Sequence, residues 1–196
     1  MTSASRVWAL AIALSFALSA PLFAETAEEK LARLPEGYVA PEDMPDSLIL
    51  VPPPPSPGSA AQALDTDIAA SKEALQDTAR FDLARRDANL EFPEVTNAFA
   101  CALGARITAE DMPRLQQLML RALVDAGSST YRAKNAYDRS RPFTQNGNAI
   151  CTPDQKEFLR NDGSYPSGHT AIGWAWAMIL AEIAPERATA LLECPL

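Results

Sequence analysis

Three observations in the sequence predict an all-α fold. From residue 59 onward, apolar side chains recur at intervals of three and four, the spacing that places them on one face of a helix. The strict alternation of apolar and polar residues that marks half-buried strands is found nowhere in the 196 residues. Glycine and proline, which interrupt helices, are missing throughout residues 59–90. We therefore expect residues 59–196 to form a compact helical domain.

Residues 1–24 have the pattern of a secretory signal peptide. Arg6 is their only charge, residues 7–18 are an apolar run of 12, and the small residue Ala24 precedes Glu25. The alternative is an uncleaved membrane anchor, for which 12 apolar residues are too few to span a bilayer. We expect cleavage after Ala24, export to the periplasm and no membrane contact afterwards.

Residues 25–58 are predicted to be a proline-rich N-terminal segment. Eight prolines fall between positions 35 and 57, a density that forbids regular helix and favours extended polyproline geometry. The stretch "SLILV" at 47–51 is too apolar for a solvated tether. Part of the segment should therefore pack on the domain.

The first half of the domain is expected to contain three helical regions. Residues 59–90 suit one long or two abutting helices, and residues 93–103 suit a shorter helix that ends before Gly104. Thr108 is expected to cap the next helix. Gly127-Ser128-Ser129 should interrupt that helix, whose apolar face comprises Met112, Leu115, Met119, Leu123 and Ala126.

In the second half, residues 130–139 resume a helical register that lasts up to Arg141-Pro142. Residues 144–165 are polar and are expected to form a loop, with one turn of helix at 154–159. Ser167 is expected to cap a final helix from residue 168 to about residue 183. Its predicted apolar face comprises Ile172, Trp176, Ile179 and Ile183.

Charge and cysteine content exclude several classes of function. The formal net charge is −8, and removing residues 1–24 takes away one positive charge to give −9. Such an acidic surface repels nucleic acid and anionic membranes, so an anionic ligand needs a local basic cluster.

Three cysteines (Cys101, Cys151 and Cys194) allow at most one intramolecular disulfide. Their spacing and the single histidine match no zinc pattern, so we expect no metal.

The only histidine lies in "YPSGHT", at the start of the last predicted helix. Unpaired N–H groups and a partial positive charge make such a helix start an anion site. Ser167 supplies a cap and a hydroxyl donor, while Gly168, without a Cβ, lets an oxyanion approach the backbone. His169 in the first turn can donate a proton. An ordinary N-cap with a surface histidine is the alternative for this short motif.

A basic cluster, "KNAYDRSRPF", lies upstream. Lys134 and Arg141 are seven residues apart, two helical turns, so both should project from one face. Arg141 precedes Pro142 and is biased out of helix. A mobile lysine charge and a planar arginine fork together suit a phosphate. With Arg132 and Arg139 beside them, a solvated basic face is the alternative.

Together, K-x6-R-P followed by P-S-G-H resembles the first two signature blocks of the type-2 phosphatidic acid phosphatase and vanadium haloperoxidase superfamily. The stretches "PDSLILVPPPP", "LARRDANL", "NAFACALG", "DRSRPF" and "NDGSYPSGHTAIGWA" are similar to the bacterial class A non-specific acid phosphatases. The resemblance runs from about Pro45 to about Leu192.

This resemblance implies a helical domain that hydrolyses small phosphomonoesters in the periplasm through a phosphohistidine, without a metal or another cofactor. It assigns phosphate binding to Lys134, Arg141, Ser167 and the Gly168 amide, and makes His169 the catalytic general acid. Inorganic phosphate and vanadate are the inhibitors that it implies. Association into a homo-oligomer stays open.

The sequence departs from the family in its third block, S-R-x5-H-x3-D, which supplies the nucleophilic histidine and is missing here. We therefore expect a domain that is incomplete at its C-terminus and has little or no activity. "ECPL" suggests a frameshift or premature stop, with Cys194 in an aberrant tail and Cys151 without its partner. The lost helices would leave the Trp174/Trp176 helix exposed.

Three alternatives remain at this point. A non-catalytic exported helical protein, phosphate-binding or structural, fits the missing nucleophile. A vanadate-dependent haloperoxidase shares the oxyanion site, but the short chain and "GSYPSGHTAIGWA" argue against it. A membrane lipid phosphatase would need transmembrane helices around the motifs.

Overall fold

The computed structural model describes residues 33–92 and 94–194, and every regular element in these ranges is helical. The all-α prediction is confirmed for this part of the chain. The expected signal peptide at residues 1–24 lies outside the described residues. The helices are α2 (Ser47–Leu50), α3 (Ala60–Ser71), α4 (Ala79–Asp87), α5 (Glu94–Leu103), α6 (Pro113–Ser129), α7 (Tyr131–Tyr137), α8 (Pro142–Asn146), α9 (Lys156–Arg160), α10 (Gly168–Ile183) and α11 (Ala188–Leu192). Short 3-10 turns are η1 (Pro41–Asp43), η2 (Lys72–Leu75), η3 (Pro153–Gln155) and η4 (Pro185–Arg187).

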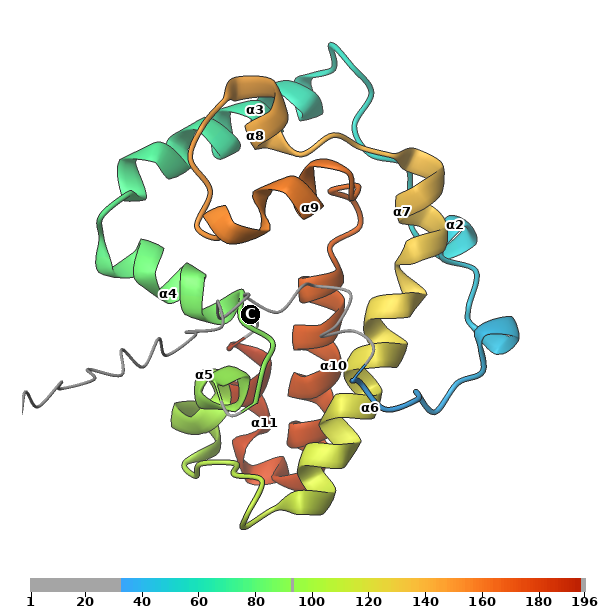
Figure 1. The fold of residues 1–196 in the computed structure, drawn as a ribbon, viewed down its shortest axis with the longest axis vertical. Coiled ribbons are helices and arrows are strands. Elements are labelled where there is room, and N and C mark those ends of the chain that lie inside the picture. The colour runs from blue at the N-terminus through green and yellow to red at the C-terminus, as the bar shows by residue number, and fades with distance from the viewer. Residues whose placement is uncertain (1–32, 93, 195–196) are drawn as a thin grey trace, which may run out of the picture.

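The core forms where α10 packs along α6, with α5 and α11 closing it from the other side (Figure 1). Trp176 of α10 is fully buried, and its indole Nε1–H donates to the Met119 carbonyl at 2.8 Å. Phe92 meets the same indole edge to face. The buried cluster comprises Val95, Phe99, Ile107, Met119, Leu123, Ile172, Trp176, Ala177, Leu180 and Leu191.

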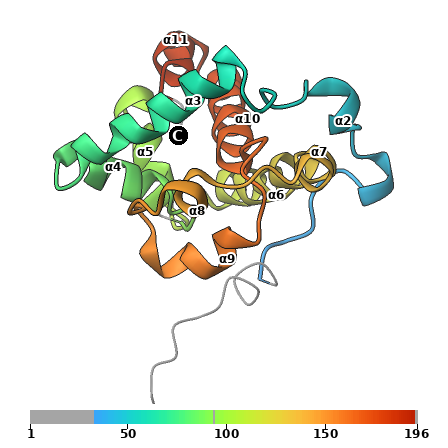
Figure 2. The same ribbon diagram turned by 90° about the horizontal axis from the view of Figure 1, so that it is seen from above.

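Helices α3 and α4 form an arc outside this core (Figures 1 and 2). Neither helix contains a buried residue. Side-chain caps begin both of them, because the Ser59 hydroxyl accepts from Gln62 N and the Thr78 hydroxyl from Phe81 N. The two-helix alternative for residues 59–90 is therefore confirmed. The arc, α8 and α9 lie at the end of the α6–α10 pair where α10 begins (Figure 1).

The described part of the proline-rich segment packs on the domain, as expected, but in an unexpected way. It contains one helical turn, α2, so the prediction that no regular helix forms was wrong. The Asp46 carboxylate caps this turn, and the buried Ser47 hydroxyl accepts from Ala133 N at 3.0 Å. Ile49 and Leu50 are exposed. Polar contacts, not the apolar side chains, therefore attach the segment to α7.

Two predictions about α6 were wrong. Thr108 does not cap it: its hydroxyl accepts from Asp111 N in a preceding turn, and the helix begins at Pro113. Residues 127–129 do not interrupt it either. The Ser129 hydroxyl donates to a helix carbonyl, that of Ala126, and Gly127 lies against Ile172 of α10. Close packing of α6 on α10 therefore keeps this stretch helical.

The segment after α6 also differs from expectation. Helix α7 ends at Tyr137 and not at residue 139, because Asp138 adopts the left-handed conformation (φ 39°) and its N–H donates to the Lys134 carbonyl. The predicted loop begins with a short helix, α8, which was not expected. The turn expected at residues 154–159 is present as η3 and α9.

Helix α10 runs from Gly168 to Ile183, as predicted. Its buried face was only partly predicted, because Ile172 and Trp176 are buried whereas Ile183 is exposed and Leu180 takes its place. Gly104 ends α5 with a positive φ of 73°, as expected for a glycine after a helix.

The three cysteines are all free thiols. The Cys194 S–H donates to the Ala98 carbonyl of α5 at 3.3 Å, and burial raises the pKa of this thiol above its usual value. Within residues 33–92 and 94–194, no helix has the length and apolar character needed to cross a bilayer.

Candidate active site

The N-terminus of α10 is built as the sequence predicts. Ser167 has an extended conformation (φ −78°, ψ 121°), and its hydroxyl accepts from Thr170 N at 3.2 Å. Gly168 and His169 are then the first two helical residues. Their N–H groups precede the first intrahelical bonds and lie at the positive end of the helix dipole. This end of α10 can therefore accept an anion.

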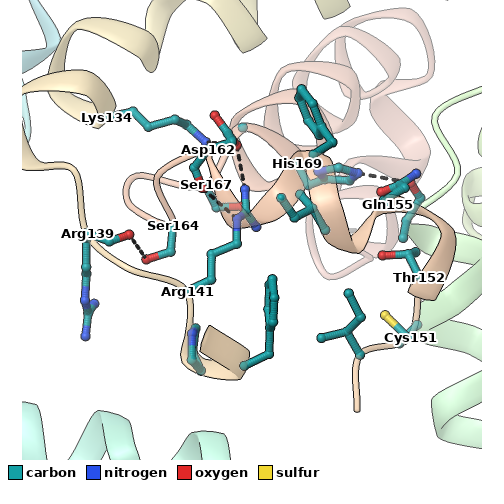
Figure 3. A pocket seen from close by; sticks show the side chains of 18 of the residues that line it. Lys134, Arg139, Arg141, Cys151, Thr152, Gln155, Asp162, Ser164, Ser167 and His169 are labelled. Atoms are coloured by element: carbon teal, nitrogen blue, oxygen red, sulfur yellow. Dashed lines mark hydrogen bonds and ion pairs between the residues drawn. The ribbon is translucent and has the colours of Figure 1, made fainter. Parts of the chain in front are cut away.

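Lys134 and Arg141 meet at one point, although not on one helical face. Lys134 lies on α7, whereas Arg141 follows the end of that helix and is extended (ψ 144°) before Pro142. The Lys134 Nζ is 3.4 Å and the Arg141 Nη2 is 2.6 Å from the same oxygen, Oδ2 of Asp162. Figure 3 shows the two cations approaching this carboxylate from different directions. The turn at Asp138, rather than helical spacing, brings them together.

Main-chain oxygens complete the contacts of the two cations. The Arg141 Nε–H donates to the Asp162 carbonyl at 2.8 Å, and the Lys134 ammonium donates to the Gly163 carbonyl at 3.2 Å. Exposure of the side chains is 6% for Lys134, 24% for Arg141 and 16% for Asp162. Low exposure weakens water screening, so charges here interact more strongly than at the surface.

Residues 162–164, the strap segment, lie directly against the end of α7. The Ser164 N–H and hydroxyl both donate to the Arg139 carbonyl, at 2.8 and 2.9 Å. At Gly163, an added Cβ would lie 3.1 Å from both the Lys134 carbonyl and its Cγ. A Cβ here would be closer than in most contacts, so a residue without one is favoured. The strap segment then leads to Ser167, so it links the cations to the start of α10.

His169 is oriented by a residue from a distant part of the chain. Its Nε2 lies 3.0 Å from the carbonyl of Ala88, which follows α4. Because a carbonyl can only accept, Nε2 carries the hydrogen in this arrangement. The ring is otherwise exposed at the cavity wall (Figure 3).

One cavity of about 2640 Å³ holds all five predicted site residues: Lys134, Arg141, Ser167, Gly168 and His169. Asp162 and Ser164 line it as well. Its walls also include apolar side chains, namely Phe81 of α4, Phe143 of α8, Phe158 of α9, and Leu90 and Ile150 from the segments between helices. Polar side chains such as Gln62, Asn89 and Gln155 line it as well, so the cavity has a mixed lining and room for a small molecule beside the two cations.

Tyr131 completes the wall beside Lys134, whose Nζ lies 5.6 Å from the ring centroid. Burial raises the pKa of the Tyr131 hydroxyl above its usual value, the Asp162 carboxylate raises it further, and Arg141 lowers it. Tyr131 therefore stays uncharged at neutral and acidic pH.

Two residues with contacts in the site, Asp162 and Ser164, were not predicted. Asp162 and Ser164 carry key contacts, yet in the sequence they are only polar residues before "YPSGH". Arg139, in contrast, turns away from the site to pair with Asp65 of α3 at 2.7 Å. The part of the chain that the structure describes contains no group of three or more His, Cys, Asp or Glu side chains able to hold a metal ion.

Comparison with known proteins agrees with this geometry. Residues 117–193 match the PAP2 superfamily, and this range contains Lys134, Arg141, Asp162, Ser167, Gly168 and His169 but not Ala88, whose carbonyl contacts His169. The chain is 41% identical over 148 residues to an acid phosphatase from Zymomonas mobilis, and 43% identical over 149 residues to a non-specific acid phosphatase from Providencia stuartii. A non-specific acid phosphatase from Salmonella typhimurium is 34% identical over 155 residues.

These alignments cover 76%, 76% and 79% of this chain, but 56%, 60% and 62% of the respective relatives. The chain thus spans about three fifths of the length of the relatives it matches. Residues 117–193 are thus similar to the PAP2 superfamily, and about three quarters of the chain is similar to the bacterial acid phosphatases named above.

Proposed function

We propose that this protein takes part in the hydrolysis of phosphomonoesters to an alcohol and inorganic phosphate, and that the described site binds the phosphoryl group. One observation carries the proposal: Lys134 and Arg141 are held within 3.4 and 2.6 Å of a single anionic oxygen, in the cavity that α10 enters with its N-terminus. Two cations and a helix N-terminus together form a strong site for a phosphoryl group.

Each residue has a role in this site. Lys134 supplies a point charge and Arg141 a planar donor to the non-bridging oxygens. The Ser167 hydroxyl and the Gly168 amide donate to the same oxygens from the start of α10. Charge that develops on these oxygens in the transition state is stabilised by donors already in place.

His169 is proposed to protonate the leaving alkoxide. The Ala88 carbonyl holds the Nε2–H, so the protonated ring has a second N–H, on Nδ1, that is not committed to this contact. Transfer of that proton to the ester oxygen, as the P–O bond breaks, yields the neutral alcohol and leaves a neutral imidazole.

A phosphohistidine route needs a second histidine, since one ring cannot serve both as nucleophile and as proton donor to the leaving group. The 196 residues contain a single histidine. In our proposal the nucleophile is therefore supplied by polypeptide other than these residues. A ring nitrogen of that second histidine forms a P–N bond as the P–O bond to the alcohol breaks, and water then cleaves the P–N bond and releases phosphate.

The single histidine also favours a second candidate function, phosphate binding without turnover. The same side chains would then hold inorganic phosphate, and no ester would be cleaved. The two functions are separated by assaying binding and turnover on the same preparation.

The test uses the protein and three variants. Orthophosphate binding is measured by calorimetry, and phosphate release is measured with p-nitrophenyl phosphate. Lys134→Ala and Arg141→Ala should each weaken binding by about 10–100-fold, the loss of a charge-assisted hydrogen bond. Arg132→Ala is the matched control, since Arg132 is 65% exposed and pairs with Asp46 away from the cavity. Binding without release would support the second candidate. Equal binding by all variants would contradict the site.

We also propose export to the periplasm, on the basis of residues 1–24. Cell fractionation with an antibody to the domain tests this, and a cytoplasmic protein of unprocessed length would contradict it.

A further inference from the structure

We propose that Asp162 is a positioning residue that fixes Lys134 and Arg141 in the geometry with which they bind phosphate. This inference rests on the proposed function, because it assigns a role within the same phosphate site. The proposed function concerns the groups that bind phosphate directly, whereas this inference concerns a carboxylate. Coulomb repulsion would normally exclude a carboxylate from a site that binds anions.

The contacts of Arg141 support a positioning role. Asp162 engages one edge of the guanidinium twice, with its carbonyl on Nε (2.8 Å) and its carboxylate on Nη2 (2.6 Å). A planar guanidinium held at two points cannot rotate. Among the residues that the structure describes, the contacts of Arg141 involve Nε and Nη2, so the N–H groups of Nη1 remain able to donate to a ligand. The direction in which Arg141 presents its donors is therefore set by Asp162.

The burial of Lys134 leads to the same conclusion. This ammonium is 6% exposed and lies beside a second cation, with Asp162 as its ion-pair partner among the described residues. Two adjacent cations repel each other, and low exposure increases the repulsion. The shared Oδ2 of Asp162 offsets that repulsion. Without it, the two side chains would separate before phosphate arrives.

The main chain that follows Asp162 is held against α7. Ser164 is bonded to the Arg139 carbonyl, and Gly163 is packed on the Lys134 main chain. Asp162 thus belongs to the strap segment, which packs against α7 and leads along the chain to the start of α10. A carboxylate that merely occupied the empty phosphate position would need to be released when phosphate binds, and this strap restricts such a movement.

The two roles predict opposite results. If Asp162 competes with phosphate, then Asp162→Asn removes a repelling charge and tightens binding. If Asp162 positions the cations, then Asp162→Asn weakens binding despite the more favourable charge. We expect orthophosphate affinity to fall by about tenfold, comparable to the loss when groups that orient metal ligands are removed.

Asp65→Asn is the matched control, because Asp65 forms the same kind of pair with Arg139 at 2.7 Å, without touching Lys134 or Arg141. It should change the affinity less than twofold. Asp162→Glu restores the charge and should recover part of the lost affinity. Equal or tighter binding by Asp162→Asn would overturn the inference. A wild-type protein that binds no phosphate would instead refute the proposed function itself.

A measurement on the wild-type protein covers the case in which Asp162→Asn does not fold. The Arg141 Nε–H resonance is observed by ¹⁵N NMR and assigned by its loss in Arg141→Ala. Bound to the Asp162 carbonyl, this N–H should exchange slowly with solvent both without and with orthophosphate. Fast exchange in the phosphate-bound protein would show that Asp162 no longer holds the guanidinium and would overturn the inference.

Discussion

At the scale of single residues, the orientation of His169 decides what its imidazole can do. The Ala88 carbonyl accepts from Nε2 at 3.0 Å, so the tautomer and the direction of the ring are both set by a contact to the end of α4. A ring held in this way needs little reorganisation before it donates a proton. The sequence placed the histidine in the first turn of a helix but gave no indication of Ala88, which is 81 residues away.

If His169 is the general acid, then His169→Asn should slow catalysis selectively in a preparation that hydrolyses phosphomonoesters. The rate on alkyl phosphates should fall by about 10²–10⁴-fold, the usual contribution of a general acid. The rate on p-nitrophenyl phosphate should fall much less, because this leaving group needs no proton. Initial rates on a series of esters with different leaving groups provide the measurement. An equal loss on all esters would argue against the general-acid role.

At the scale of elements, the site depends on how the strap segment lies against α7. A side chain at Gly163 would crowd α7, since an added Cβ would be 3.1 Å from the Lys134 carbonyl and Lys134 or the strap segment would have to shift. Gly163→Ala should therefore lower the free energy of unfolding by about 1–3 kcal/mol, the usual cost of overpacking. It should also weaken orthophosphate binding, because Lys134 is displaced. Urea denaturation and calorimetry measure the two effects.

Gly168→Ala is the control for the effect on stability alone, because Gly168 itself belongs to the proposed phosphate site. Its added Cβ would meet only the Thr130 hydroxyl at 3.9 Å, an ordinary contact, so stability should stay within about 0.5 kcal/mol of wild type. If both variants had the same stability, the close approach of the strap segment to α7 would not be needed for folding.

The elements also show what the sequence could predict and what it could not. The Ser167 cap and helical periodicity predicted the bounds of α10, and periodicity predicted the apolar face of α6, whose Met119 and Leu123 are buried in the core. It failed at Gly127-Ser128-Ser129, where packing against Ile172 outweighs the low helix propensity of these residues. It also failed after Tyr137, where the left-handed conformation of Asp138 ends α7.

In the candidate site, the sequence predicted the residues whose conformation follows local rules and missed a contact made between distant parts of the chain. Ser167 and Arg141 follow local rules, those of the helix cap and of the residue before proline, and both rules are obeyed. The role of Asp162 depends on a contact between residues 28 positions apart, made after the chain has folded back. Spacing along the chain contains no information about such a contact.

At the scale of the whole molecule, α10 belongs both to the core and to the site. Its first turn carries Ser167, Gly168 and His169, and its middle carries the fully buried Trp176. The core thereby holds in place the end of the helix that we propose binds phosphate, while the arc of α3 and α4 contributes no buried residue. Stability and phosphate binding should consequently be separable by mutation along α10.

Trp176→Phe tests this separation. The variant loses the hydrogen bond to the Met119 carbonyl and leaves a small cavity, so the free energy of unfolding should fall by about 1–3 kcal/mol. Orthophosphate affinity of the folded protein should stay within about twofold. Trp174→Phe is the control, since Trp174 is 43% exposed on the same helix and should cost much less. A large loss of affinity in Trp176→Phe alone would show that the core and the site are not independent.

The most direct test of the phosphate site is an experimental structure of the protein with vanadate or tungstate bound. We expect the oxyanion to lie between the Lys134 ammonium, the Arg141 guanidinium and the Gly168 amide, with Asp162 still in contact with both cations. An oxyanion bound elsewhere in the cavity, or no binding at millimolar concentration, would contradict the account.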